Sequence, residues 1–147
     1  KNKIELLTVK LKKLSKKERL FSYFIFSFNN KKFVQQRTAK DIWQNLYEFY
    51  LEETIINPEW NIEKIKEWLE QKLNIHEAKS ISIIHAKKQM LTHQLINGYF
   101  IYVELKTKPV LKKITGDWLS EDEIKAKAFP QFIHQFINTK TLQKQVL

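Results

Sequence analysis

Three glutamates near the middle of the chain have the spacing best suited to metal chemistry. Glu63, Glu67 and Glu70 stand at positions i, i+4 and i+7 of the segment NIEKIKEWLEQKL. On a helix this spacing brings three carboxylates to one side, where their hard oxygens suit a divalent cation. Three lysines alternate with these glutamates, and alternating charges are typical of a solvent-exposed helix face. We therefore predict an exposed charged face here and no metal site.

Other catalytic arrangements are missing from the sequence. The chain has no cysteine and only two glycines, which argues against a thiolate metal site, a cysteine nucleophile and a glycine-rich phosphate loop. No serine lies in a nucleophile-elbow motif, and the histidines lack zinc-type spacing. The four histidines are His76, His85, His93 and His134. The residues by themselves predict a binding module rather than an enzyme.

The net charge of +10 favours an anionic partner such as nucleic acid. Residues 1–18 carry seven lysines against two glutamates, which is half of the whole excess. The alternative is a lysine-rich but inert solvated surface, since lysine outnumbers arginine by 24 to 2 in this chain. We expect residues 1–18 to be a basic interdomain linker and residues 19–147 to be one globular domain.

The rest of the composition predicts a soluble, intracellular protein. The chain lacks cysteine, and it has no apolar run of the length that a membrane-spanning helix needs. We therefore expect no membrane partner. The sequence starts at Lys1 rather than at a methionine, and we expect it to be a fragment of a longer chain.

Hydrophobic patterns predict an α+β domain, in which a mixed β-sheet is flanked by helices. An aromatic strand at 19–28 and a second strand at 33–37 should form a hairpin around the turn NNKK. A helix should follow at 61–73, with Asn61 as its N-cap. Two long strands should cover 80–91 and 93–106. Ser120 with Glu123 predicts a capping box, and Pro130 suits the first turn of a closing helix.

Three segments of the chain carry motifs of a known kind. The segment RTAKDIWQNLYEFYLEE (37–53) resembles the R-x-x-x-x-I-W-x-G-L-x-E-F-P motif in the C-terminal domain of MutY-type adenine DNA glycosylases. QMLTHQLINGYF is similar to its H-x-L-[ST]-H loop and following strand, and KAKAFPQFIHQF is similar to its closing A-x-P-x-x-[IL]-x-x-[FY] helix. The motifs occur in the family's order over residues 19–138.

The resemblance implies a Nudix-like fold related to MutT, used to read 8-oxoguanine opposite a mispaired adenine in double-stranded DNA during base excision repair. Catalysis in that family belongs to an N-terminal glycosylase domain with a 4Fe-4S cluster, which would act in cis with this chain. The chain has no cysteine to bind such a cluster, so we expect no cofactor and no catalytic residue in it. The implied location is the bacterial cytoplasm, at the nucleoid.

Two other functions remain open. The first is a degenerate Nudix hydrolase that uses Glu52, Glu67 and Glu70 with magnesium. The active signature is G-x5-E-x7-R-E-x-x-E-E, and counted from Glu52 its Arg-Glu pair falls on Trp60 and Asn61, which argues against hydrolysis. The second is a protein-interaction module whose exposed aromatic side chains dock a partner.

The resemblance places a base-reading loop at Gln89, Leu91, Thr92 and His93. Guanine has an acceptor at N7, whereas 8-oxoguanine carries a hydrogen there, so that a hydroxyl oxygen can accept from it. Thr92 stands where the family has Ser or Thr and supplies that oxygen. His93 would position the loop or touch the strand, and Leu91 would act as an apolar wedge. Gln89 replaces a common histidine.

The same resemblance predicts the use of segment 37–53. Trp43, Leu46, Tyr47 and Phe49 should anchor an irregular loop on the sheet. Outward-facing side chains near it should contact DNA phosphates; the candidates are Arg37, Lys40, Gln44 and Lys88. Asn45 and Tyr50 replace the family's glycine and proline, and asparagine tolerates the left-handed backbone that a sharp turn requires.

Overall fold

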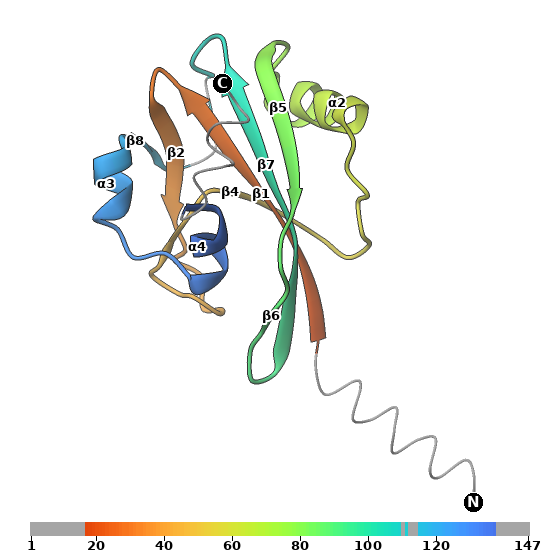
Figure 1. Ribbon diagram of the computed structural model, residues 1–147, viewed down its shortest axis with the longest axis vertical. Helices are drawn as coiled ribbons and strands as arrows, with labels where there is room; N and C mark the ends of the chain where they lie inside the picture. Colours follow the sequence, from red (N-terminus) through yellow and green to blue (C-terminus); the bar gives the residue numbers. More distant parts are fainter. Residues whose placement is uncertain (1–16, 110, 112–114, 138–147) are drawn as a thin grey trace, which may run out of the picture.

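The computed structural model describes residues 17–109, 111 and 115–137. Its strands and helices form an α+β fold, with a mixed sheet flanked by helices, as predicted (Figure 1). In chain order the elements are β1 (Lys17–Phe28), β2 (Lys31–Gln36), β3 (Tyr47–Glu48), β4 (Tyr50–Thr54), α2 (Ile62–Leu73), β5 (Ala78–His85), β6 (Gln89–Met90), β7 (Gln94–Leu105), β8 (Asp117–Leu119), α3 (Glu121–Lys125) and α4 (Gln131–Ile137).

The centre of the sheet is a long parallel pair formed by β1 and β7. The pairing runs from Lys17 opposite Gln94 to Ser27 opposite Glu104. Strands β4 and β2 pair antiparallel with β1, and β5 and β6 pair antiparallel with β7. Gly98 allows the central strands to come close, since a Cβ built at this position would lie 1.7 Å from the carbonyl oxygen of Phe21.

Two aromatic cores cover the two faces of the sheet. Side chains alternate across a strand, and in β1 Phe21, Tyr23 and Ile25 belong to one core whereas Phe24 and Phe26 belong to the other. The first core also contains the buried side chains of α4, and the second contains those of α2. The helices therefore lie on opposite faces of the sheet (Figure 1).

Local sequence signals account for several of these elements. Asn29 and Asn30 both have a left-handed backbone, with φ of 53° and 63°, and they join β1 to β2 in a tight hairpin. The Asn61 side chain accepts a hydrogen bond from the backbone N–H of Lys64 and caps α2. The capping box of Ser120 with Glu123 is present in α3. All three predictions are confirmed.

The predicted strand at 80–91 is wrong in one respect, because it is interrupted. Strand β5 ends at His85, and β6 resumes pairing with β7 only at Gln89. Between them the side-chain amide of Gln135 in α4 accepts from the Lys87 N–H at 2.7 Å and donates to the Lys87 carbonyl at 2.8 Å. A helix side chain thus takes the backbone bonds that a strand partner would have made.

No helix in the described part of the chain is long and apolar enough to cross a membrane.

Candidate nucleic-acid interface

The β6–β7 hairpin carries the predicted reading loop at one end of the sheet. The Leu91 N–H donates to the Gln94 carbonyl at 2.7 Å and closes a tight turn around Thr92 and His93. The backbone N–H of Lys17, at the start of β1, donates to the His93 carbonyl at 3.2 Å. Both Thr92 and His93 are exposed. The fold therefore presents the threonine and the histidine at the tip of a turn whose backbone is held on two sides.

The apolar side chains of this hairpin are arranged differently from the prediction. Leu91, the predicted wedge, is half-buried and packs against the α4-side core. Met90 is instead 57% exposed. The half-buried Gln89 has a side-chain oxygen that is shielded from solvent and has no hydrogen-bond partner among the described residues. Met90 is the side chain that the sequence reasoning missed, and its position beside Leu91 was the available signal.

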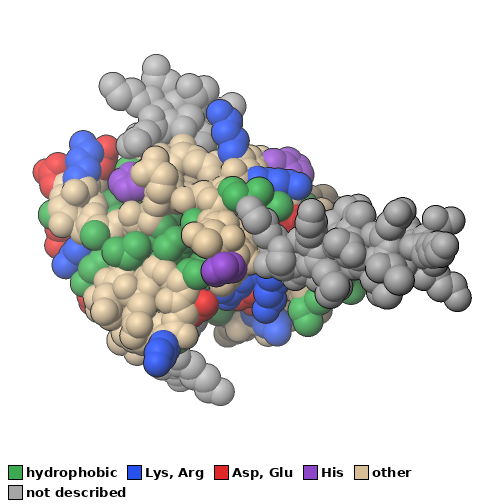
Figure 2. All heavy atoms as spheres, turned by 90° about the horizontal axis from the view of Figure 1, so that it is seen from below, with side chains coloured by type: hydrophobic (Ala, Val, Ile, Leu, Met, Phe, Trp, Pro, Cys, Tyr) green, Lys and Arg blue, Asp and Glu red, His purple; other side chains and the backbone are tan. Residues whose placement is uncertain are grey.

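Besides Met90, two consecutive exposed isoleucines lie at the same end of the sheet. Ile55 and Ile56, which follow β4, are 98% and 79% exposed. Thr54 pairs with Leu20 in β1, and Met90 pairs with Leu95 in β7. Three strand spacings, about 14 Å, separate β4 from β6. Figure 2 views the molecule from this end, and hydrophobic side chains lie among Lys, Arg and His side chains on the face shown.

The loop between β2 and β3 is anchored by aromatic packing, as predicted. The Trp43 ring packs edge-on against Phe21, with ring centres 5.7 Å apart, and stacks with Phe132 of α4 at 6.1 Å. Trp43 and Asn45 both have a left-handed backbone, with φ of 59° and 71°. The sharp turn expected at Asn45 is therefore present.

This turn leads to a prediction about stability. Replacement of Asn45 by alanine should lower the free energy of unfolding by about 1 kcal/mol, since alanine pays the steric cost of the left-handed conformation. Asn45→Gly should change it by less than about 0.5 kcal/mol, because glycine adopts the conformation freely. Urea unfolding of the two variants checks this, and equal losses in both would contradict the role given to the backbone.

The prediction that Arg37 faces outward is wrong. Its side chain is 9% exposed, and it makes ion pairs of 2.9 Å with Glu48 and with Asp41. Its guanidinium also lies 5.7 Å from the Phe21 ring centre and 5.9 Å from that of Trp43. Burial acts to lower the pKa of Arg37, but the hydrogen bond and charge of Glu48 outweigh it, and the pKa is raised. Arg37 is therefore bound within the protein rather than presented to phosphates.

The other predicted phosphate contacts, Lys40, Gln44 and Lys88, are all exposed. Gln44 also donates a side-chain hydrogen bond of 3.3 Å to the Thr38 carbonyl. Lys40 directly precedes Asp41. Asp41 and the side-chain oxygen of Gln94 accept hydrogen bonds from the same Arg19 nitrogen, at 2.9 and 3.1 Å respectively. The β2–β3 loop and the hairpin are therefore neighbours, and together they form a surface with exposed lysines and two exposed threonines, Thr38 and Thr92.

Asp41 is held ionised by its arginine neighbours. Its hydrogen bond with Arg19 lowers its pKa from 3.8 to about 2, and the Ile42 N–H and the charge of Arg37 add to the effect. A folded-state pKa below the ordinary value means that the ionised group stabilises the fold above about pH 4, and that this contribution is lost as the pH falls towards 2.

The expected consequence is a pH-dependent effect of Asp41→Asn. At pH 6 the variant should be less stable than the parent by about 1 kcal/mol, a figure already reduced for solvent screening, and the difference should close between pH 4 and pH 2. Urea unfolding across this range is the measurement, with Glu67→Gln on the exposed side of α2 as the control. A gap that stays constant with pH would show that the charge of Asp41 is not what stabilises the loop.

The carboxylates of the alternative hydrolase are not arranged as a metal site. Glu52 accepts a hydrogen bond from the Trp68 indole N–H at 3.1 Å. Glu67 and Glu70 are exposed on α2, as the alternating charges predicted. In the described parts of the chain, no three His, Asp or Glu side chains are grouped so that they could hold a metal ion.

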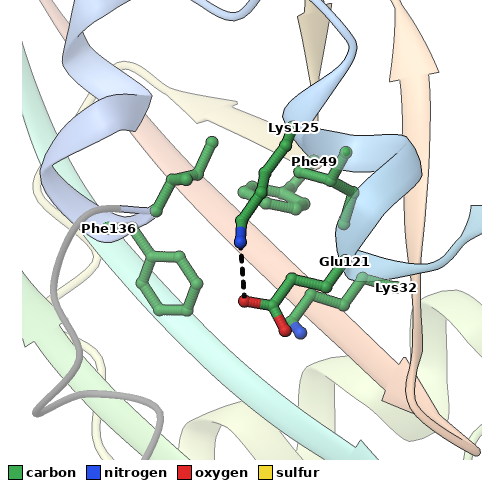
Figure 3. Close-up of a pocket in the computed structure, with 7 residues that line it drawn as sticks. Lys32, Phe49, Glu121, Lys125 and Phe136 are labelled. Carbon is green, nitrogen blue, oxygen red and sulfur yellow. Dashed lines mark ion pairs between the residues drawn. The ribbon is translucent and has the colours of Figure 1, made fainter.

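A cavity of about 30 Å³ lies between β2, α3 and α4 (Figure 3). It is lined by Phe49, Phe136 and Lys32, with the Glu121–Lys125 ion pair at its side. Burial lowers the pKa of Lys32. Lys32 pairs with Ser27 of β1, whereas Lys17 of β1 pairs with Gln94 beside the hairpin. Ser27 and Lys17 are ten residues apart along the strand, which corresponds to about 33 Å. The cavity therefore belongs to the other end of the molecule.

Comparisons with known proteins give a family and a fold. Residues 22–139 match the family model of the NUDIX domain. A comparison with curated protein sequences gave no match. The C-terminal domain of mouse MUTYH, solved in complex with human PCNA, is similar in structure, with a TM-score of 0.62 and 12% identity over 89% of this chain and 92% of that one.

Nudix-type enzymes are similar as well. MutT from Aliivibrio salmonicida and Vibrio cholerae has a TM-score of 0.54 and 13% identity, over 83% of this chain and 95% of that one. RenU, a Nudix hydrolase from M. smegmatis, has a TM-score of 0.57 and 8% identity, over 87% and 89%. At these identities the likeness shows the fold, and the predicted Nudix-like fold is confirmed.

Proposed function

The chain belongs to the Nudix domain family, and from this premise we propose that it is a DNA-damage recognition domain that reads 8-oxoguanine opposite adenine. In this proposal the β6–β7 hairpin approaches the damaged base, and the exposed lysines around it meet the phosphates. Excision of the adenine would be the work of an N-terminal glycosylase domain in cis, which would also hold the 4Fe-4S cluster.

The observation that carries the proposal is that Thr92 is an exposed residue at the tip of a fixed turn. Both neighbouring backbone bonds, Leu91 to Gln94 and Lys17 to His93, hold the turn without using the threonine side chain. Its oxygen is thus available to accept a hydrogen bond from a ligand. The N7–H of 8-oxoguanine is a donor where guanine has an acceptor, so this single bond distinguishes the two bases.

The likeness to solved structures does not by itself distinguish base recognition from hydrolysis, and the arrangement of the side chains is what favours base recognition. Both MUTYH and MutT relatives share the fold. The hydrolase alternative needs grouped carboxylates, and Glu52 is instead bonded to Trp68. The exposed surface around Thr92 has a use in base recognition and has none in a carboxylate-metal hydrolase.

The test is a binding titration of the whole chain with three duplexes that differ at one base. Fluorescence anisotropy at low salt should give tighter binding to DNA with 8-oxoguanine opposite adenine than to DNA with guanine opposite adenine or with a normal pair. Equal affinity for the three would overturn the proposal. Release of phosphate from an oxidised guanine triphosphate in the presence of magnesium would favour the hydrolase instead.

The salt dependence of binding gives an independent prediction. The described surface offers only a few lysines beside the hairpin, such as Lys40 and Lys88, so few counterions should be released. We expect the contacts of this surface to contribute about −2 to −4 to the slope of log K against log salt concentration, to which the lysines of residues 1–16 would add. Lys40→Ala should reduce the slope by about one and weaken binding to all three duplexes alike, whereas Lys64→Ala on α2 should do neither.

A further inference from the structure

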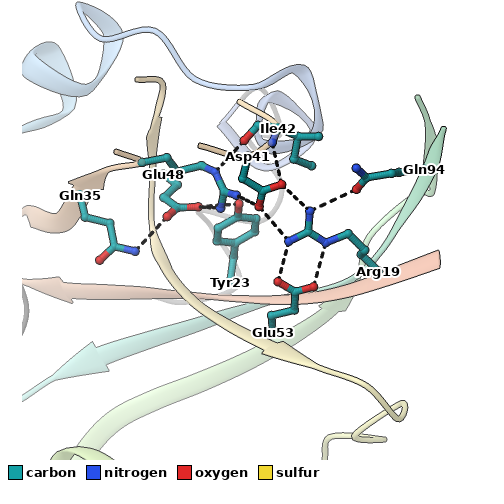
Figure 4. A network of polar contacts seen from close by, with 9 residues as sticks. Arg19, Tyr23, Gln35, Asp41, Ile42, Glu48, Glu53 and Gln94 are labelled. Carbon is teal, nitrogen blue, oxygen red and sulfur yellow. Dashed lines mark hydrogen bonds and ion pairs between the residues drawn. The ribbon is translucent and has the colours of Figure 1, made fainter. Parts of the chain in front are cut away.

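The chain has two arginines and 24 lysines, and both arginines pair with Asp41 and so belong to one network. Figure 4 shows the part of this network around Arg19, beside Gln94 of the hairpin. Arginine and lysine carry the same charge, but only the planar guanidinium presents five donors in a fixed fork. A chain that uses lysine almost everywhere else has arginine at the two places where several acceptors meet. The two positions therefore depend on the planar geometry of the guanidinium and not only on its positive charge.

Arg19 uses its complete fork. It makes two hydrogen bonds of 2.8 Å with Glu53, two of 2.9 Å with Asp41, and one of 3.1 Å with the side-chain oxygen of Gln94. Its side chain is 11% exposed, and the guanidinium lies 5.0 Å from the Phe21 ring centre. The hydrogen bonds that Arg19 donates to Glu53 and Asp41 raise the pKa of Arg19 above its ordinary value.

The three acceptors belong to three separate segments. Asp41 lies in the β2–β3 loop, Glu53 lies in β4, and Gln94 is the first residue of β7. Figure 4 shows the Arg19 guanidinium between these three side chains. The two carboxylates already neutralise the charge of Arg19. The hydrogen bond to the uncharged Gln94 side chain therefore serves to fix the position of Gln94.

Gln94 is also the residue that closes the turn of the hairpin, since its carbonyl accepts from Leu91. Thr92 lies two residues before it. A hydrogen bond from the threonine oxygen to a base needs a separation of about 2.7–3.0 Å and weakens steeply beyond that. A small displacement of Gln94 is therefore enough to move the hydroxyl out of reach.

We propose that Arg19 is a positioning residue, which acts through Gln94 to hold the β6–β7 hairpin in a fixed place relative to the β2–β3 loop. The inference rests on the proposed function, in which these two segments contact the same duplex. Because the two contacting segments are fixed before DNA arrives, binding does not include the entropic cost of ordering them.

The test compares Gln94→Met, which keeps the length of the side chain without its acceptor, with Gln94→Glu, which keeps an acceptor for Arg19. The ratio of affinities for 8-oxoguanine and guanine duplexes should fall about three- to tenfold in Gln94→Met and stay within about twofold in Gln94→Glu. Arg19→Lys keeps the charge but loses the fork, and it should behave like Gln94→Met. The control is Tyr23→Phe, which removes the 2.8 Å bond from Tyr23 to Glu48 at the far side of the network. It should lower stability and leave the ratio unchanged.

A second readout works without DNA. Hydrogen exchange at the Leu91 amide should be about three- to tenfold faster in Gln94→Met and Arg19→Lys than in the parent, and near the parent's rate in Gln94→Glu and Tyr23→Phe. Unchanged exchange and an unchanged affinity ratio in Gln94→Met would overturn the positioning role. If the parent chain does not distinguish the duplexes, the proposed function fails, and the exchange rates alone decide whether Arg19 fixes the hairpin.

Discussion

Replacement of Thr92 by valine should reduce the discrimination between 8-oxoguanine and guanine by about 1–3 kcal/mol, or about 5- to 150-fold in the ratio of affinities. Valine has nearly the shape of threonine but no oxygen, so the N7–H of the damaged base would lose its acceptor and be left unpaired at the interface. Anisotropy titrations of parent and variant with both duplexes give the ratio directly.

Two further variants make this result specific to the hydroxyl. Thr92→Ser keeps the oxygen and should retain most of the discrimination. Thr107→Val changes an exposed threonine just after the far end of β7 and should have no effect. A Thr92→Val variant with the parent's affinities for both duplexes would remove Thr92 from the recognition of the base.

Glu48→Gln should lower the free energy of unfolding by about 3 kcal/mol, because it leaves a buried guanidinium without its main counter-ion. The Glu48 side chain is 6% exposed and pairs with Arg37, which is 9% exposed. Glu48 also accepts from Tyr23 at 2.8 Å and from Gln35 at 3.0 Å. An amide has only one oxygen, so the three donors cannot all keep an acceptor. Urea unfolding at neutral pH measures the loss.

The matched control is Glu121→Gln in α3. Glu121 pairs with Lys125 at 3.7 Å, and both side chains are more than 60% exposed. An exposed pair of this kind contributes less than about 0.5 kcal/mol, so the variant should be nearly as stable as the parent. Similar losses of stability at both positions would contradict the view that burial makes the Glu48–Arg37 pair contribute more than an exposed pair.

The elements that could be predicted from the sequence are those that depend on neighbouring residues. Two consecutive asparagines specify the β1–β2 turn, and Asn61 and Ser120 specify the starts of α2 and α3. The motifs around Trp43, Thr92 and Pro130 also resembled those of a Nudix-like domain, and the fold confirms that part of the resemblance. These signals lie within a few residues of one another, where backbone preferences decide the outcome.

The contacts that could not be predicted join segments distant in the sequence. The parallel pairing of β1 with β7 brings Lys17 beside Gln94, and the sequence of neither strand specifies which strand it pairs with. The interruption after His85 depends on Gln135, which lies 48 positions from the backbone that it binds. Nothing in a hydrophobic pattern specifies such a side chain.

The resemblance of segment 37–53 to a DNA-reading domain places Arg37 outward with Lys40 and Gln44, whereas the structure buries its side chain. Its partners Glu48 and Asp41 lie 11 and 4 residues away, and the folded loop is what brings all three together. The signal that was available is compositional. With only two arginines in a lysine-rich chain, each one marks a place where fork geometry is needed.

A double-mutant cycle between protein and DNA measures the proposed hydrogen bond from N7–H of 8-oxoguanine to the Thr92 oxygen. Parent and Thr92→Val are each titrated with a duplex containing 8-oxoguanine and with one in which carbon replaces N7 of the same base. We predict a coupling energy of about 1–3 kcal/mol between the two changes. Additive effects, with no coupling, would contradict the claim.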